Sequence, residues 1–270
     1  MKKIREREII LGIQWEMNSS AALMVDGEII SAVSEERFTN VKNDERYPLN
    51  AINYLLKSNN ITGKELTSVT FATKDWSPAN ILIRKYSKFS VSDFIYEQEK
   101  YWYPTIYQSK KLRKIDIFKR FLDIDQYPGK KFWRKIVQRL DKIDTDTFKN
   151  NKSIKILGNY VRKNIVSNHL KVDDKKIIFA DHSSTHAAYA YYSGTCNGKK
   201  ALVLTLDAYG DKANNTVRVI YPRKNRIHEK IISKSQNSII ARLYRYTTLV
   251  LNLKPDNHEY KVMGLAAYSK

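Results

Sequence analysis

Apolar runs of strand length occur in this chain as two groups of three: 8–15, 20–25 and 28–37, then 199–206, 214–221 and 226–233. Within the first group, Asp26-Gly27 separates the second run from the third. This dipeptide favours a tight hairpin, because both central residues of a type I′ turn need a positive φ. The sequence therefore predicts two three-stranded meanders, and two such openings in one chain indicate a duplicated, two-lobed protein.

A helix and a further strand follow the first meander. Pro48–Asn60 has a helical pattern with its proline near the first turn, where the missing N–H is tolerated, and Leu66–Ala72 returns to strand character. The order β-β-β-α-β is the opening of the ribonuclease-H-like lobe of actin-type and sugar-kinase-type ATPases. We therefore expect an α/β, ribonuclease-H-like two-lobe ATPase fold, with nucleotide between the lobes and the second lobe incomplete.

The middle of the chain has a different composition. Residues 76–170 contain 21 Lys and Arg against nine Asp and Glu, a net charge of +12 out of +20 for the chain. Aromatic residues are interspersed without strand alternation, and Lys110–Leu122 and Lys131–Leu140 have helical patterns. The expected organisation is a first lobe at 8–74 and 175–198, a helical basic aromatic insertion at 75–174 and a truncated second lobe at 199–270.

Composition restricts the class of protein. Hydrophobic residues make up 42% of the chain, enough to form a core. No segment approaches the roughly 20 apolar residues of a membrane helix, and the N-terminal apolar stretch is too short for a signal peptide. Cys196 is the single cysteine, which fits a reducing compartment, so we expect a cytoplasmic protein without membrane contact.

The positive charge raises the question of a polyanionic partner. Aromatic rings among Lys and Arg suit single-stranded nucleic acid, but such a segment is more often a helical subdomain with its rings packed inward. An anionic acceptor substrate is another use for the charge. Nucleic acid is therefore not an expected partner.

Two histidines at helical spacing form a candidate metal site. The strand at 175–180 leads into Asp181, and a helical segment with His182 and His186 follows. Residues four apart on a helix share one face, so both imidazoles could bind one ion. Asp207 and Gly210 follow the buried strand 199–206, where a tight turn can direct N–H groups at phosphates and the carboxylate can hold a metal-bound water or a ribose. An ordinary strand-ending turn is the alternative.

Several stretches together resemble the amino-terminal domain of the NodU/CmcH-type carbamoyltransferases. Their order and spacing carry the resemblance, which does not include 75–174. The matching stretches are Ile10–Ile13, Ser20–Gly27, Ser34–Phe38 with Lys42 and Pro48, Asp181–Ala188, Leu204–Gly210 and Glu259–Ala266.

The resemblance implies a two-step reaction. In that family a carboxy-terminal YrdC-like domain makes carbamoyladenylate from carbamoyl phosphate and ATP. The amino-terminal domain, similar to the tRNA threonylcarbamoyl-transfer protein, then passes the carbamoyl group to a hydroxyl of a sugar or secondary metabolite. This chain would be an incomplete carbamoyltransferase that needs a second polypeptide for the rest of lobe two and the YrdC-like domain. The alternatives are a degenerate, non-catalytic nucleotide-binding protein and a basic nucleic-acid-binding module.

The resemblance also implies roles for particular residues. A divalent metal, iron or similar, would bind to His182 and His186, with a third ligand, an aspartate, beyond residue 270. The residues expected to bind the ATP or carbamoyladenylate cofactor are Asp207, Gly210, Lys261 and Gly264. The residues expected at the transfer site, at the end of the third strand, are Glu35, Arg37 and Lys42, where a lysine can neutralise developing negative charge. A solvated strand end and a plain structural helix are the respective alternatives.

One departure from the family concerns catalysis. Family members have a His-Asp pair just before the Ser-Ala-Ala run, where this chain has Met17-Asn18. Neither a thioether nor an amide acts as a general base near neutral pH, and Glu16 is the one nearby candidate. His169, His228 and His258 show no site pattern and are expected to be surface or cap residues.

Overall fold

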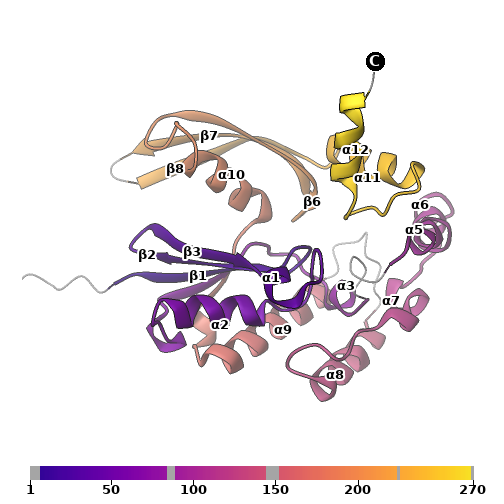
Figure 1. Ribbon diagram of the computed structural model, residues 1–270, viewed down its shortest axis with the longest axis horizontal. Helices are drawn as coiled ribbons and strands as arrows, with labels where there is room; N and C mark the ends of the chain where they lie inside the picture. Colours follow the sequence, from indigo (N-terminus) through magenta and orange to yellow (C-terminus); the bar gives the residue numbers. More distant parts are fainter. Residues whose placement is uncertain (1–6, 84–88, 144–151, 224–225, 269–270) are drawn as a thin grey trace, which may run out of the picture. The chain divides into compact units, whose positions relative to one another are not determined.

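The chain forms two compact units. The computed structural model describes residues 7–83, 89–143, 152–223 and 226–268 (Figure 1). The first unit contains the chain up to Phe71 together with Trp76–Ile178, and the second contains Ala72–Asp75 and the chain from Phe179 onward. Within the described residues, no helix is both long and apolar enough to cross a membrane.

A mixed five-stranded sheet forms the centre of the first unit. Its strands are β1 (Ile9–Gln14), β2 (Ser20–Val25), β3 (Glu28–Ser34), β4 (Ser68–Phe71) and β5 (Ile177–Phe179), in the order β3-β2-β1-β4-β5. β2 pairs with β1 and β3 in antiparallel fashion, and β4 adds to β1 in parallel. The predicted turn between β2 and β3 is confirmed, since Asp26 and Gly27 have φ values of 50° and 89°.

Helices cover one face of this sheet. Within the described residues, the α-helices of the first unit are α1 (Glu36–Thr39), α2 (Leu49–Ser58), α3 (Pro78–Ile83), α5 (Val91–Glu97), α6 (Tyr103–Tyr107), α7 (Lys114–Ile117), α8 (Lys130–Asp141) and α9 (Lys152–Leu170). α2 and α9 lie on the same side of the sheet (Figure 1). Leu11 and Leu23 of the sheet and Leu55 of α2 are fully buried. The Arg162 guanidinium of α9 lies 5.2 Å from the centroid of the Phe71 ring of β4.

Two predicted elements of this unit differ in extent. The third strand was expected to reach Arg37 but ends at Ser34, and the one-turn helix α1 follows. The helix expected at Lys110–Leu122 is reduced to α7 and a 3-10 turn at Lys119–Phe121. Ser109 has a left-handed backbone (φ 53°), and the basic residues that follow would put positive charge at the positive end of a helix dipole.

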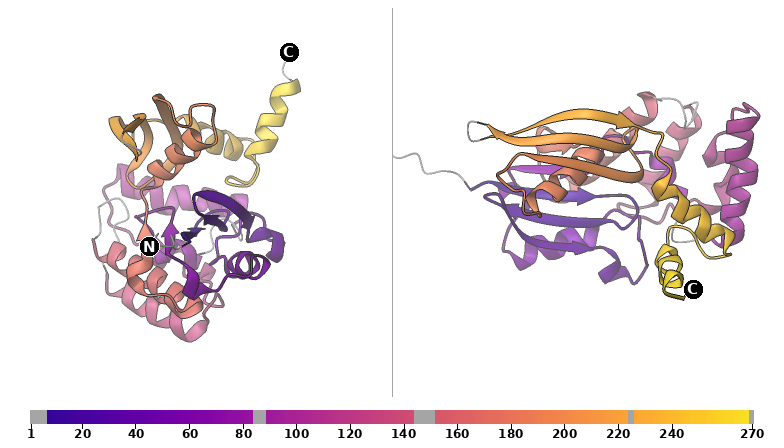
Figure 2. Two further views of the ribbon diagram at one scale, coloured as in Figure 1. Left: turned by 90° about the vertical axis from the view of Figure 1, so that its left-hand side faces the viewer. Right: turned by 90° about the horizontal axis from the view of Figure 1, so that it is seen from above.

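The second unit has a three-stranded antiparallel sheet. Its elements are α10 (His182–Tyr192), β6 (Ala201–Gly210), β7 (Ala213–Arg223), β8 (Arg226–Ser235), α11 (Ile240–Val250) and α12 (Glu259–Leu265). The order β6-β7-β8 confirms the second meander. α10 packs on one face (Figure 2), where the core consists of Ala187, Tyr191, Val203 and Ile220. On the opposite face, Leu202, Leu204 and Leu206 are 61%, 62% and 58% exposed.

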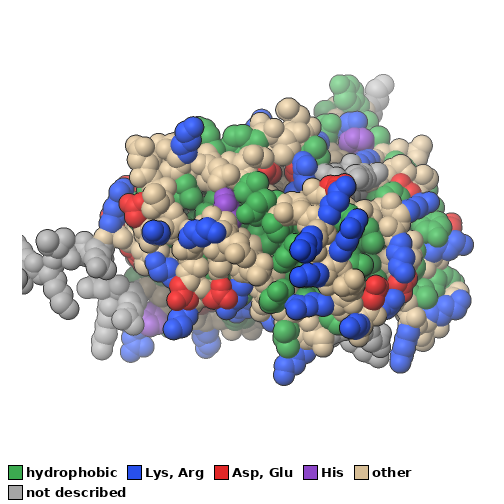
Figure 3. All heavy atoms as spheres, turned by 90° about the horizontal axis from the view of Figure 1, so that it is seen from below, with side chains coloured by type: hydrophobic (Ala, Val, Ile, Leu, Met, Phe, Trp, Pro, Cys, Tyr) green, Lys and Arg blue, Asp and Glu red, His purple; other side chains and the backbone are tan. Residues whose placement is uncertain are grey.

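The division between the units differs from the expected domain boundaries. The first lobe was expected to include 175–198, but α10 packs on β6 and β7 and therefore groups with the second unit. The segment 76–174 groups with the first sheet. Its described residues contain helices and turns, with Trp133 and Ile136 of α8 buried and Lys131, Arg134 and Lys135 exposed. Lys and Arg side chains are prominent on the face seen from below (Figure 3).

Candidate metal centre

The start of α10 presents both predicted metal-binding histidines. Asp181 is the N-cap residue, and its carboxylate accepts a hydrogen bond from the Ser184 amide at 3.1 Å. Burial alone would raise the pKa of Asp181, but hydrogen bonds from Ser183 and Ser184 and the nearby Lys234 ammonium lower it to about 2. An ionised cap is favourable at the positive end of the helix dipole. His182 and His186 then lie on one face of α10, one turn apart, as predicted from their spacing.

A carboxylate from β6 completes a group of three potential ligands. Asp207 Oδ2 lies 2.6 Å from His182 Nε2 and 3.5 Å from His186 Nε2, and the two Nε2 atoms are 3.1 Å apart. Burial would raise the pKa of Asp207, but hydrogen bonds from His182 and His186 hold it well below its usual value. The carboxylate is therefore ionised at neutral pH, as a metal ligand must be.

The chemistry and spacing of these groups fit a divalent ion. Two imidazoles and one carboxylate are a common donor set for zinc and for iron. Ligands about 2.1 Å from a tetrahedral ion lie about 3.4 Å from one another. The distances of 3.1 and 3.5 Å match that spacing, and the 2.6 Å contact between His182 and Asp207 would lengthen. The side chain of His186 is 52% exposed, so one side of the cluster is open.

Gly210 allows His182 to approach the sheet. A Cβ atom at position 210 would lie 2.1 Å from Cδ2 of the His182 ring. Any larger residue would therefore displace the imidazole or the strand. The sequence pointed to Asp207 and Gly210 as cofactor-binding residues. The structure brings both to the histidine cluster, Asp207 as a third potential ligand and Gly210 as the surface under the ring.

Asp211 fixes the backbone around the cluster and was missed by the sequence analysis. Its carboxylate, 7% exposed, accepts hydrogen bonds from the His182 amide at 2.6 Å and the Asp75 amide at 2.6 Å. The Lys74 amide and the Thr73 hydroxyl also donate to it. Asp211 thereby ties Ala72–Asp75 to the first turn of α10. The residue pattern gave no signal for this role, because the donors are backbone groups distant in sequence.

Arg218 is a second residue that the sequence analysis missed. It lies in the middle of β7 with its side chain fully buried, and it bonds to Ser184 and Glu229. Val217 and Val219 on either side would by simple alternation be assigned to the buried face. The structure instead directs Arg218 toward α10.

The predicted transfer-site residues belong to the first unit. Glu35 is buried, and its carboxylate accepts hydrogen bonds from the amides of Asn50 and Ala51 at 3.2 and 2.8 Å, at the N-terminus of α2. Arg37 in α1 and Lys42 in the following loop are exposed. Glu35 therefore has a structural role as a helix cap, whatever chemistry it takes part in.

The two remaining predicted cofactor-binding residues lie on α12. Lys261 is exposed, and its Nζ is 6.0 Å from the centroid of the neighbouring Tyr260 ring. Gly264 is exposed as well, and a Cβ there would have no atom within 4 Å. Both residues are thus exposed on α12, a helix that contacts α11 elsewhere along its surface.

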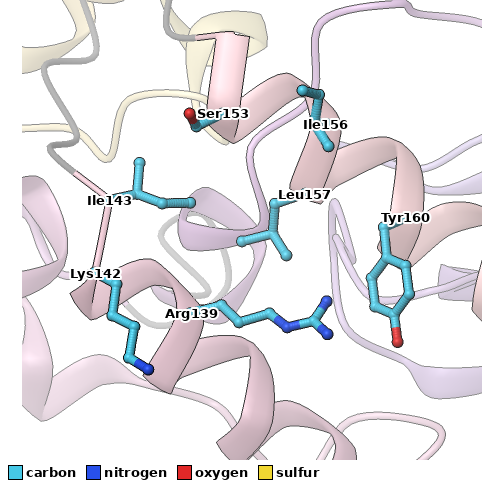
Figure 4. Close-up of a pocket in the computed structure, with 7 residues that line it drawn as sticks. All are labelled: Arg139, Lys142, Ile143, Ser153, Ile156, Leu157 and Tyr160. Atoms are coloured by element: carbon cyan, nitrogen blue, oxygen red, sulfur yellow. The ribbon is translucent and has the colours of Figure 1, made fainter.

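A shallow groove of about 400 Å³ lies between α8 and α9 (Figure 4). The Arg139 guanidinium lies 4.5 Å from the centroid of the Tyr160 ring at its edge. The described residues that line it are Arg139, Lys142, Ile143, Ser153, Ile156, Leu157 and Tyr160. They include no carboxylate, imidazole or thiol, and none of the predicted site residues, so the groove does not compete with the cluster on α10 and β6 as a site of chemistry.

Comparison with known proteins identifies relatives. The uncharacterized protein sll1178 of Synechocystis sp. is 26% identical over 262 residues, which cover 97% of this chain and 35% of that protein. The chain thus spans about a third of the length of this curated relative. Among solved structures, YeaZ from Pseudomonas aeruginosa aligns with a TM-score of 0.34 and 8% identity, over 83% of this chain and 67% of that one. A second Pseudomonas aeruginosa protein, described as similar to peptidase YEAZ, aligns with a TM-score of 0.35 and 9% identity, over 83% and 66% of the two chains. These two similarities are too low to support an argument.

The family assignment rests on the sequence. The family model described as the carbamoyltransferase N-terminus matches residues 9–270, which includes the segment 75–174 that the motif comparison left out. This chain belongs to the carbamoyltransferase family and represents its amino-terminal, transferase-type domain.

Proposed function

We propose that this chain binds a divalent metal ion through His182, His186 and Asp207 and takes part in the transfer of a carbamoyl group to a hydroxyl. The observation that carries the proposal is the convergence of the three ligand atoms, all within 4.8 Å of one another, in a chain of the carbamoyltransferase family. The bound ion, iron or a similar metal, would supply Lewis-acid polarisation of a carbamoyl or phosphoryl oxygen.

The donor in this proposal is carbamoyladenylate, formed from carbamoyl phosphate and ATP. The acceptor oxygen bonds to the carbamoyl carbon, the bond from that carbon to the phosphate oxygen breaks, AMP leaves and the hydroxyl proton passes to a base. The acceptor is a sugar or secondary metabolite. This chemistry fits a ribonuclease-H-like ATPase fold in the cytoplasm, in which Lys42 and Arg37 stabilise negative charge and Lys261 and Gly264 adjoin the nucleotide.

Transfer also requires a base that takes up the proton of the acceptor hydroxyl. Asn18, in the turn from β1 to β2, has a left-handed backbone with φ of 61°, and Met17 is 43% exposed. These residues form a turn and supply no group that takes up a proton near neutral pH. Glu16 is the nearest carboxylate in the sequence. The proposal therefore assigns proton removal to Glu16 or to the bound substrates.

A further polypeptide completes the proposed enzyme, whether continuous with this chain or separate. The leucine face of β6, defined by Leu202, Leu204 and Leu206, is more than half exposed. A contiguous exposed apolar surface of this kind marks a site of association. The relative sll1178 is about three times as long as the part it shares with this chain. We propose that this further polypeptide covers the leucine face and contains the carbamoyladenylate-forming domain.

Metal binding and transfer can be tested separately. We expect His182→Ala to abolish Zn²⁺ or Co²⁺ binding in calorimetric titration, while His228→Ala, on the exposed strand β8, leaves binding unchanged. In the presence of a YrdC-like domain, carbamoyl phosphate and ATP, mass spectrometry should detect carbamoylated acceptor with the wild-type chain but not with His182→Ala. Metal binding without any transfer would favour the degenerate, non-catalytic protein over the enzyme.

A further inference from the structure

α10 is held by different forces at its two ends. Its second half packs through Ala187 and Tyr191 against Val203 and Ile220 of the sheet. Its first turn has no apolar side chain, and the residue buried there is Ser183. Polar contacts must therefore fix how the first turn is rotated about the helix axis, and that rotation decides where the imidazoles point.

Arg218 supplies those contacts from β7. Its Nη1 donates to Ser184 Oγ at 2.8 Å and its Nη2 donates to Ser183 Oγ. Nη1 also donates to Glu229 Oε2 at 2.8 Å, and Nε donates to Thr216 Oγ1 at 3.1 Å. Nη2 lies 3.6 Å from Asp181 Oδ1. The guanidinium thus joins the central strand to the two residues that directly follow His182.

Stability alone does not explain a guanidinium at this position. The Arg218 side chain is fully buried, and removing a charge from water costs several kcal/mol even after partial pairing. Apolar residues of similar volume often replace buried ion pairs without loss of stability. An apolar residue at 218 could pack between β7 and α10, but it could not bond to the Ser183 and Ser184 hydroxyls.

The tolerance of a metal site makes small rotations costly. Side chains reach about 5 Å from a helix axis, so a rotation of roughly 20° moves a side-chain atom by about 2 Å. Metal–ligand distances hold to within about 0.2 Å. Asp211 already fixes the His182 backbone through its amide at 2.6 Å. The side chains of Ser183 and Ser184, which follow His182, still need a bonding partner on the sheet to fix the rotation of the first turn.

We propose that Arg218 is a positioning residue for the metal centre: by holding Ser183 and Ser184 it sets the rotation at which His182 and His186 converge on Asp207. This inference rests on the proposed metal-binding function. Arg218 does not contact the ligand atoms and acts through the first turn of α10.

The test measures metal affinity and geometry in the full chain. We expect Arg218→Lys, which keeps the charge but loses the planar fork of donors, to lower the Co²⁺ affinity about 10- to 100-fold, the usual effect of removing a group that orients a ligand. The visible absorption bands of bound Co²⁺ should change at saturation, because the ligand geometry relaxes. Arg223→Met, at the exposed end of the same strand, is the matched control and should leave affinity and spectrum unchanged.

A second variant keeps the test decisive if Arg218→Lys does not fold. Ser183→Ala combined with Ser184→Ala leaves the guanidinium in place but cuts its link to α10, and should reproduce the loss of affinity. Combined with Arg218→Lys it should add little, since the groups act as one unit. Wild-type Co²⁺ affinity in a folded Arg218→Lys or double-serine variant overturns the inference. Wild-type affinity in His182→Ala would instead overturn the metal site and with it the proposed function.

Discussion

The sheets of the two units begin alike and end differently. Both are antiparallel meanders of three strands, but in the first unit β4 adds in parallel to β1, with Leu11 opposite Val69. In the second unit β6 occupies the place of β1, and no described strand pairs with its other edge. The meander is thus specified by local residues and turns, whereas completion of the sheet depends on segments far along the chain.

The two sheets also differ in how their faces are buried. Along β1 the alternate residues Ile9, Leu11 and Ile13 are at most 3% exposed, because α2 and α9 cover that face. Along β6, Val203 and Thr205 face α10 and are buried, while the leucine face is not. In the second sheet, therefore, one face is covered by a helix, and the candidate metal centre lies on that face.

Truncating one leucine in each sheet gives the largest expected difference. Leu11→Ala should lower the free energy of unfolding by about 2–5 kcal/mol, since it leaves a cavity in a fully buried core. Leu204→Ala should change the free energy of unfolding by less than about 0.5 kcal/mol, because this side chain is exposed. All four tryptophans, at 15, 76, 102 and 133, belong to the first unit. Urea titration by tryptophan fluorescence therefore follows that unit, and far-UV circular dichroism follows both.

The exposure of Leu204 can also be tested through association with another polypeptide. If a further polypeptide covers the leucine face, Leu204→Asp should weaken the association of that polypeptide with the chain while leaving the isolated chain folded. A large loss of stability in isolated Leu204→Ala would contradict the comparison, because it would mean that the leucine face is already buried within the chain.

Glycines in the two corresponding strands, β6 and β1, extend this comparison. A Cβ at Gly210 would lie 2.1 Å from the His182 ring, whereas a Cβ at Gly12 of β1 would meet the Ala22 carbonyl oxygen of the adjacent strand at an ordinary 3.7 Å. Gly210→Ala should therefore lower Co²⁺ affinity by about 10- to 100-fold, as expected when ligand orientation is lost. Gly12→Ala is the matched control and should leave affinity unchanged. Equal Co²⁺ affinities for both variants would show that metal binding does not depend on the close approach of the His182 ring to Gly210.

The sequence was informative where neighbouring residues determine structure. Alternation and the Asp26-Gly27 turn predicted both meanders, and helical spacing put His182 and His186 on one face. The position of Asp207 beside the histidines could not be predicted this way, because Asp207 meets His182 across 25 residues and the strand end suggested a phosphate turn just as well. The family resemblance instead implied a third metal ligand, an aspartate, beyond residue 270. Arg218 was hidden by the flanking valines, and the predicted helix at Lys110–Leu122 depended on periodicity that the basic residues at its start oppose.

The two units also use histidine differently, which predicts a smaller, pH-dependent effect. In the first unit, His169 Nδ1 lies 3.0 Å from the Tyr47 hydroxyl and Nε2 lies 2.8 Å from Asn53 Oδ1. These contacts suit a neutral ring that accepts a hydrogen bond from the tyrosine and donates one to the amide oxygen. Burial lowers the pKa of His169 from 6.5 to about 4. This histidine was expected to be a surface or cap residue. It lies in the last turn of α9, half-buried, and contacts Asn53 of α2.

The sign of the pH effect follows from which state binds the proton. As pH falls from 6.5 toward 4, the unfolded chain takes up a proton at position 169 that the folded chain does not, so folding stability decreases over that window. His169→Gln removes the titrating group and should flatten this part of the stability profile measured by tryptophan fluorescence. His228 lies in the exposed strand β8, where its ring stacks on Tyr221. The control variant His228→Gln should keep the wild-type dependence of stability on pH. Because carboxylates titrate near the lower end of the same window in all three proteins, the difference between the profiles isolates His169, and parallel profiles would mean that its ring accepts a proton equally well in both states.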